Sequence, residues 1–537
     1  MAQEEYDALA KGPLAEDRDP LSVELVTAEP VPDAVISDRV RAALPGADFS
    51  VEAAFDETAD RYHFVDFPDI DPQGQERAVF EFGRALRHAT DVAEANPVMP
   101  DSLYGAHHVA GLNEALFSLC ETPRDNSLPF GWHHPRIDSI GAWRHTRGEG
   151  VTVAVIDTGY SDHAELRGVR TQQGEINLVE GGSNAADRFS TGLLRNPGHG
   201  TLVMSVVASR GTADPSGGTS GPGAVTGTAP AAKIMPVRAI RSVVDLNQRR
   251  IGKAIDHAVA NGADVIAMAL GGPTRVASTE AALRRAAQAG VVIVCAAGNC
   301  WPNVVFPAAY AAMGICTAVA ALQPDLRPWK KSGRGSQVTF SAFGEQVWGA
   351  AKNAPDDPVT GVRASQGTTL ATSMTAGVAA LWVARHGGRA ALKQKADARG
   401  STVQAMWVRC AVAGMTPPAE WGGARDLGAG LLNARAALDA ALPAASEAPE
   451  APDLEAVSTL NVLQMHLAGT SEAAVPGHVT PEMADYAPEM IWLSYRAGAR
   501  ARMLESDAET PMQPDDPSEG LAALLAQDPA LRSALGQ

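Results

Sequence analysis

The sequence predicts a doubly wound α/β domain with a mostly parallel sheet over residues 128–440. Two observations predict this class. First, continuous apolar runs of strand length alternate there with segments of helical periodicity, as expected for parallel strands covered on both faces. Second, the apolar spacing changes on either side of this region. A chain of 537 residues, 45% hydrophobic and 20% charged, is long enough for two or three folded domains.

The strands and helices of the central domain alternate along the chain. The strands are predominantly apolar runs at 151–157, 232–240, 263–270, 291–297 and 315–322. The helices between them have apolar residues at helical spacing and lie at 200–209, 251–262 and 278–290. Because each parallel strand needs a crossover connection, this alternation favours helices packed on both faces of one sheet.

A smaller α+β unit is expected over residues 21–98. Its predicted strands alternate apolar and polar residues and lie at 21–29, 48–57, 61–68 and 91–98. Its predicted helices lie at 34–44 and 76–89, and Pro45-Gly46 ends the first. The order β-α-β-β-α-β is that of a ferredoxin-like unit. Residues 1–20 then form an N-terminal extension, and residues 99–127 link this unit to the central domain.

The C-terminal region, residues 441–537, begins with a linker rich in Ala, Pro and Glu. Short helices are expected behind it, at 461–469, 488–504 and 520–535. Their Met and Leu spacing favours packing against the rest of the chain, with a surface for a partner as the second interpretation.

Charge is unevenly distributed along the chain. Residues 1–100 carry 22 acidic and 8 basic side chains and residues 441–537 carry 15 and 4, whereas residues 101–440 carry 25 and 32. Without a Lys/Arg cluster, the basic middle is weak support for nucleic-acid binding, and we expect none. A simpler interpretation is that the acidic ends dock on the basic middle.

Sequence composition also indicates the cellular compartment. No apolar run approaches the ~18 residues that cross a membrane, so we expect no membrane span. The N-terminus is acidic and lacks the apolar core of a signal peptide. The five cysteines are scattered, which argues against a disulfide framework. These features together predict a cytoplasmic protein.

Polar residues follow the predicted strands where a catalytic site would form. Asp157 ends a buried strand, His199 begins a helix after a Gly/Pro loop, and Thr368-Thr369 precede another helix. A carboxylate that orients a histidine, which in turn deprotonates a hydroxyl, is the machinery of acyl transfer. Asn299 lies just past a strand end and offers a side-chain amide for the oxyanion.

Each of these features has a common structural interpretation when taken alone. An Asp-Thr-Gly is usually a turn, a His before a helix is usually a loop or cap residue, and a Thr there is usually an N-cap. Only their joint occurrence, in the order Asp, His, hydroxyl and on the expected elements, favours catalysis. The pairs His107-His108 and His133-His134 lack the spacing of metal ligands, so we expect them to be structural.

In these segments the chain resembles the subtilisin-like (S8, subtilase) peptidase family. The matching segments run in family order over about 128–440: VAVIDTGYSDHAEL (with Ala164 where proline is usual), GHGTLVMSVVA, GTAPAAKIMPVR, MALGG, AAGN and LGAGLLNARAAL. The resemblance implies that Asp157 orients, His199 is the general base and Asn299 is the oxyanion donor. It also implies that two segments line the peptide cleft, Ala269-Leu270-Gly271 and Ala296-Ala297-Gly298.

The nucleophile position departs from the family pattern Gly-Thr-Ser-Met-Ala. With Gly367, Thr368, Ala371, Ala376 and Gly377 in register, Thr369 stands where the family has serine. A second register would use Ser373, but it loses most downstream matches and lies roughly 6 Å further along the helix. Thr369 is therefore the aligned nucleophile, and we expect its extra methyl group to slow the reaction.

The resemblance implies a serine-type endopeptidase that acts on peptides or proteins through an acyl-enzyme. It also implies that residues 21–98 are a propeptide-like domain of a zymogen and partner of the catalytic domain. No cofactor is expected; the family often binds calcium, but no ligand set stands out. The alternative is a catalytically impaired pseudopeptidase that holds a peptide, or its own propeptide, in the cleft.

Overall fold

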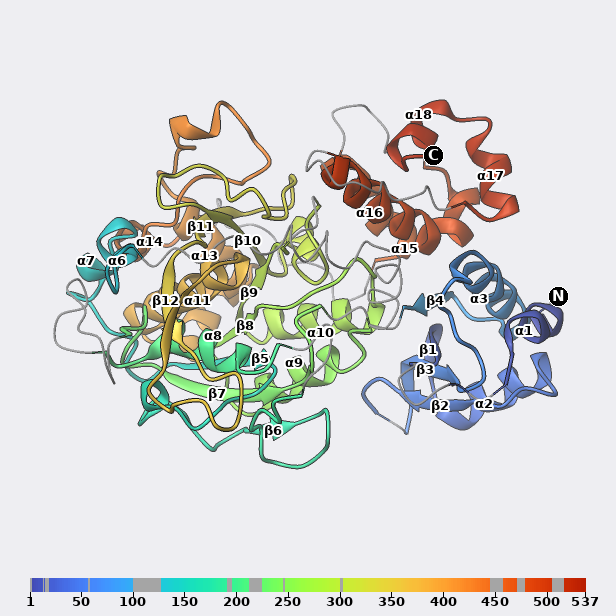
Figure 1. Cartoon of the computed structure of the whole chain (residues 1–537), viewed down its shortest axis with the longest axis horizontal. Coiled ribbons are helices and arrows are strands. Elements are labelled where there is room, and N and C mark those ends of the chain that lie inside the picture. The colour runs from blue at the N-terminus through green and yellow to red at the C-terminus, as the bar shows by residue number, and fades with distance from the viewer. Residues whose placement is uncertain are drawn as a thin grey trace.

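The computed structural model describes residues 2–12, 14, 19–56, 58–99, 127–190, 196–211, 225–244, 247–299, 303–444, 457–470, 479–504 and 516–537. Figure 1 shows three parts. The N-terminal unit comprises the described residues of 2–99, the α/β body those of 127–444, and the C-terminal helices those of 457–537. The N-terminal unit (blue) and the C-terminal helices (red) lie side by side at one end of the body (Figure 1).

The N-terminal unit has the expected β-α-β-β-α-β order. Its elements are β1 (Leu21–Val31), α2 (Asp33–Ala43), β2 (Ser50–Ala53), β3 (Asp60–Phe67), α3 (Glu76–Thr90) and β4 (Glu94–Val98). The strands form an antiparallel sheet in the order β2-β3-β1-β4, which confirms the ferredoxin-like prediction. A helix that was not expected, α1 (Ala2–Leu9), packs on α3 and buries Tyr6 and Leu9 in the same core.

The α/β body contains a seven-stranded sheet in the order β11-β10-β9-β8-β5-β7-β6. Its strands are β5 (Thr152–Asp157), β6 (Ile176–Asn177), β7 (Lys233–Arg238), β8 (Val265–Met268), β9 (Val292–Ala296), β10 (Thr317–Leu322) and β11 (Phe340–Phe343). Every neighbouring pair is parallel, which confirms the predicted class. After β5, the chain forms β6 and β7 on one side of it and then crosses to form β8 on the other side. The strand order therefore reverses at β5, and ligands of such sheets bind at this switch point.

Helices cover both faces of this sheet. The longer ones are α8 (His199–Ala208), α9 (Ile251–Ala260), α10 (Ala277–Gln288), α11 (Thr368–Arg385), α12 (Gly388–Asp397) and α13 (Val403–Val412). The short elements are α6 (His133–Arg136), α7 (Ser139–Ala142), α14 (Ala434–Asp439), η1 (Ala164–Leu166), η2 (Ala308–Met313), η3 (Ala419–Trp421) and the hairpin β12 (Val347–Ala350) with β13 (Val362–Ser365). Helix α11 packs against β8, β9, β10, β11 and α8, and all its residues from Thr368 to Val383 are buried.

The C-terminal region is helical as predicted, with α15 (Thr459–Thr470), η5 (Pro481–Tyr486), α16 (Ala487–Leu504), α17 (Glu519–Leu525) and α18 (Pro529–Ala534). Most of the connection expected at 99–127 lies outside the described residues, as do His107 and His108. Among the helices that the structure describes, none has the length and apolar character needed to cross a membrane.

The acidic N-terminal unit docks on basic side chains of the body. Arg249 of the body lies 2.9 Å from both carboxylate oxygens of Asp66, and Lys253 lies 2.7 Å from Glu52. The expected docking of an acidic end on the basic middle is therefore present in the structure.

Two adjacent histidines, His133 and His134, are buried within the α/β body. The Nε2 of His134 donates to the carbonyl of Thr226 at 2.9 Å, and its Nδ1 accepts from the Ser139 hydroxyl at 2.8 Å. Burial lowers the pKa of His134 to about 4 and holds the pKa of His133 well below its usual range. Both side chains are thus held neutral as part of the core.

This burial predicts acid sensitivity. Below pH 6.5, His134 binds a proton in the unfolded chain but not in the folded chain until about pH 4, so stability falls as the pH drops through this window. Each unit of pH costs about 1.4 kcal/mol, or about 2 kcal/mol between pH 6.5 and 5. Urea unfolding at pH 7.5 and pH 5 should show this loss, and His134→Gln should reduce it. An unchanged pH dependence in the variant would contradict the assignment.

Candidate active site

Asp157 is the last residue of β5 and has no exposed surface. Its carboxylate accepts a hydrogen bond from the backbone N–H of Thr158 at 2.7 Å. A buried carboxylate is costly unless it has partners, and the remaining partner comes from a different element. The strand end thus places one charged group at the switch point of the sheet.

His199 is the first residue of α8 and provides that partner. Its Nδ1 lies 2.9 and 3.0 Å from the two carboxylate oxygens of Asp157. Because the carboxylate can only accept, the ring carries its proton on Nδ1, and Nε2 keeps its lone pair. The backbone before it needs glycine: Gly198 has φ +77°, and a Cβ there would collide with the carbonyl oxygen of Lys352.

Thr369 lies in the first turn of α11, with its hydroxyl oxygen 3.1 Å from His199 Nε2. The Thr369 side chain is almost completely buried. Ser373, one turn later, donates its hydroxyl to the carbonyl of Thr369 at 2.7 Å and is fully buried. The structure therefore brings Thr369, and not Ser373, to the histidine.

Asn299 follows β9 and faces the start of α11. Its Oδ1 accepts from the backbone N–H of Thr368 at 2.9 Å and from the Thr368 hydroxyl at 2.8 Å. These two donors fix the amide orientation, so its NH₂ is turned to the side of Gly367. A Cβ at Gly367, which has φ +131°, would lie 2.9 Å from Asn299 Nδ2. Glycine at 367 thus keeps space open beside this amide.

The two segments expected to line a peptide cleft follow neighbouring strands, since Ala269-Leu270-Gly271 follows β8 and Ala296-Ala297-Gly298 ends β9. Ala297 uses both backbone groups internally: its N–H donates to Val319 at 3.0 Å, and its carbonyl accepts from Val305 at 3.0 Å. Gly271 donates its N–H to the carbonyl of Val243 at 3.0 Å. These two residues therefore support the wall of the site through backbone bonds to the body.

Asp187 is a contributor to the site that sequence reasoning missed. Its Oδ2 accepts from the Thr158 hydroxyl at 2.9 Å and from the Gly198 N–H at 2.8 Å. It therefore joins the residue after Asp157 to the residue before His199. No spacing rule marks this carboxylate, because it lies in an irregular segment and its role depends on contacts with two other loops.

The family resemblance raises the question of a metal site, because the family often binds calcium. Within the described parts of the chain, no group of three or more His, Cys, Asp or Glu side chains is placed to hold one.

The α/β body is similar to known proteins. A profile of the Subtilase family matches residues 148–433. Thermitase of Thermoactinomyces vulgaris is 30% identical over 287 residues, which cover 51% of this chain and 92% of thermitase. Subtilisin E of Bacillus subtilis (strain 168) is 28% identical over 266 residues, which cover 48% of this chain and 62% of that protein.

Among solved structures, MycP1 with its N-terminal propeptide removed matches with a TM-score of 0.44 and 24% identity, over 58% of this chain and 99% of that one. A protease from Pseudoalteromonas arctica matches with a TM-score of 0.46 and 26% identity, over 59% and 99%. Because the family profile covers more than half of the chain and thermitase is matched over nearly its whole length, this chain belongs to the subtilase family of serine-type peptidases.

Proposed function

We propose that this protein hydrolyses peptide bonds with Thr369 as nucleophile, His199 as general base and Asp157 as the group that orients His199. One observation carries the proposal: the ring of His199 bridges the Asp157 carboxylate at 2.9 Å and the Thr369 hydroxyl at 3.1 Å. Both distances lie within the reach of proton transfer. The family supports a serine-type endopeptidase in general terms.

The reaction proceeds through an acyl-enzyme. Thr369 Oγ attacks the scissile carbonyl carbon while its proton moves to His199 Nε2. The tetrahedral intermediate collapses, the C–N bond breaks, and His199 returns the proton to the leaving amine. Water then loses a proton to His199 and attacks the ester, which releases the acid and restores the hydroxyl of Thr369.

The Asn299 amide is positioned to stabilise the oxyanion. Its oxygen is occupied by Thr368, so its NH₂ is the end available to a developing negative charge. The backbone N–H of Thr369 lies in the first turn of α11, where N–H groups have no acceptor within the helix. Loss of one such donor costs other enzymes about 10²–10³ in kcat.

The methyl group of Thr369 is the main obstacle to fast catalysis. Threonine is restricted at χ1, and its methyl group occupies space in a site where the side chain is already nearly buried. An off-rotamer hydroxyl costs about 0.5–1.5 kcal/mol, and a misplacement of about 1 Å can cost about 10²-fold in rate. The proposal is therefore a slow endopeptidase.

A second candidate function is a pseudopeptidase that keeps its N-terminal unit bound. It is favoured by the way Glu24 of β1 docks on the body. The Glu24 carboxylate, fully buried, accepts from the backbone N–H groups of Ala277 at 2.7 Å and Ser278 at 2.8 Å, at the start of α10. A helix N-terminus stabilises such a carboxylate. In either candidate, the N-terminal unit acts as a propeptide-like partner.

The roles of the triad can be tested on the purified full chain. We expect mass spectrometry to show self-cleavage between residues 98 and 128, and His199→Ala to abolish it along with hydrolysis of an apolar peptide, by about 10⁴-fold or more. Ser373→Ala is the matched control and should retain both, because its hydroxyl only bonds the carbonyl of Thr369. Self-cleavage that persists in His199→Ala would contradict the mechanism.

Replacement of the nucleophile separates the two candidates. Thr369→Ser removes only the methyl group, so kcat/KM for a peptide should rise by up to about 10²-fold if that group misplaces the hydroxyl. A parent chain that stays intact and inactive, and becomes active only as Thr369→Ser, would support the pseudopeptidase instead. Thr369→Ala is expected to be inactive in both cases.

A further inference from the structure

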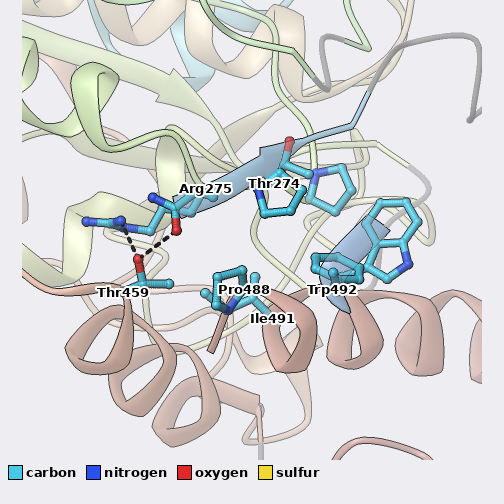
Figure 2. A pocket seen from close by; sticks show the side chains of 10 residues that line it. Thr274, Arg275, Thr459, Pro488, Ile491 and Trp492 are labelled. Carbon is cyan, nitrogen blue, oxygen red and sulfur yellow. Dashed lines mark hydrogen bonds between the residues drawn. The ribbon is translucent and has the colours of Figure 1, made fainter. Parts of the chain in front are cut away.

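The three parts of the chain meet at one buried polar junction, of which Figure 2 shows Arg275 and Thr459. Each part contributes two residues to it: Glu94 and Asn96 from β4, Arg275 and Glu280 from the body, and Val457 and Thr459 at the start of the C-terminal helices. None of the functions discussed above uses these residues.

Arg275 is at the centre of the junction and is fully buried. Its Nη1 donates to Glu94 at 3.0 Å and to the Thr459 hydroxyl at 2.6 Å. Its Nη2 donates to Glu280 at 3.2 Å and to the Val457 carbonyl at 2.6 Å. A buried guanidinium needs such partners, and here they come from all three parts of the chain.

The C-terminal helices bind the same carboxylate that Arg275 holds. The backbone N–H of Thr459 donates to one oxygen of Glu94 at 2.8 Å, and its hydroxyl donates to the other at 2.7 Å. Burial alone would raise the pKa of Glu94, but the charge of Arg275 and the Thr459 bonds outweigh it and hold the pKa below its usual value. Glu94 therefore stays charged and keeps both partners.

Helix α16 holds the N-terminal unit at a second place, along α3. Glu489 of α16, with 2% of its side chain exposed, pairs with Arg84 of α3 at 2.9 Å. Glu489 is also fixed by the backbone N–H of Ser518 at 2.6 Å. Trp492, one turn along α16, is part of the hydrophobic core of the N-terminal unit. Asp485, just before α16, pairs with His88 at 2.9 Å.

The same helix also contacts the body. The Tyr495 hydroxyl donates to the carbonyl of Val304, and its ring lies 6.1 Å from that of Phe306. A cavity of about 10 Å³, room for about one water, remains beside the junction. Pro488, Ile491 and Trp492 of α16 line it opposite Thr274 and Arg275 of the body (Figure 2).

We propose that the described C-terminal residues, 457–470, 479–504 and 516–537, form a clamp that holds the N-terminal unit on the α/β body, so that scission of the connecting segment does not by itself uncover the peptidase. The holding role rests on the contacts above, and its regulatory consequence rests on the proposed function. Release of the enzyme is slow while the clamp is in place, and it becomes fast when the clamp is removed or its contacts with α3 and β4 are broken.

The N-terminal unit is held by two interfaces, so it dissociates more slowly than it would from either one alone. The N-terminal unit is held by the body through Glu24 and Asp66, and separately by the clamp through Glu94 and Arg84. Once one interface is formed, the second forms at a high effective concentration, so both must open for the unit to leave. Breaking the clamp side alone should therefore speed dissociation strongly.

The test uses the full chain with Thr369→Ala, so that self-digestion plays no part. A recognition sequence for a site-specific protease is inserted into the connecting residues 100–126, and an affinity tag is placed at the N-terminus. After cutting, the tagged unit is immobilised and release of the rest of the chain is followed with time. We expect slow release from the parent.

Two variants each remove one contact between the clamp and the N-terminal unit, one at α3 and one at β4. Arg84→Ala leaves the buried Glu489 without its charge partner and should speed release roughly 30-fold or more. Thr459→Val removes the hydroxyl that bonds Glu94 and Arg275 and should speed release roughly fivefold to 100-fold. Arg41→Ala is the matched control, because its guanidinium lies over Phe49 inside the N-terminal unit, and it should match the parent.

The outcomes are distinct. If Arg84→Ala does not fold, Thr459→Val at the other end carries the test. Folded variants that release the unit at the parental rate would overturn the clamp. With Thr369 restored, peptide hydrolysis after cutting should rise in parallel with release. Faster release without any hydrolysis would overturn the regulatory consequence and the proposed catalysis, while the holding role would stand.

Discussion

The position of the active site depends on the complete burial of helix α11. Every residue from Thr368 to Val383 is buried, because the helix packs against strands β8 to β11 on one side and against α8 on another. Gly377 makes this packing possible, since a Cβ there would lie 2.5 Å from the Cβ of Thr228. A helix packed this closely cannot slide or rotate without creating clashes or voids. Its first turn therefore holds Thr369 at a fixed position relative to His199.

A second constraint fixes the two loops that carry Asp157 and His199. Parallel strands bring their carboxyl ends to one edge of the sheet, but the loops beyond them need further connections. Asp187 provides one by accepting from Thr158 and from the N–H of Gly198. The buried hydrogen bonds of this carboxylate reduce the motion of both loops, so Asp157 and His199 are held in a fixed relation to each other.

Buried charge also organises the contacts between the three parts of the chain. Glu24 at the start of α10, Arg275 at the junction and Glu489 on α16 each need partners from another part, since an unpaired buried charge is costly. Apolar packing alone would tolerate several docking positions, whereas these hydrogen bonds have one geometry. These contacts therefore fix the position of the N-terminal unit relative to the C-terminal helices, and of both relative to the body.

The sequence by itself determined the types of the main elements, and it also led to the triad that we propose, because both depend on local patterns. Apolar runs identified β5 and β7 to β10, and the glycines around Thr369 set its register on α11. The tertiary structure alone decided the role of Asp187, the packing of α1 on α3 and the junction of Glu94, Arg275 and Thr459. These features join residues far apart in the chain. Their contacts depend on how whole elements pack, and no local pattern of apolar spacing encodes that packing.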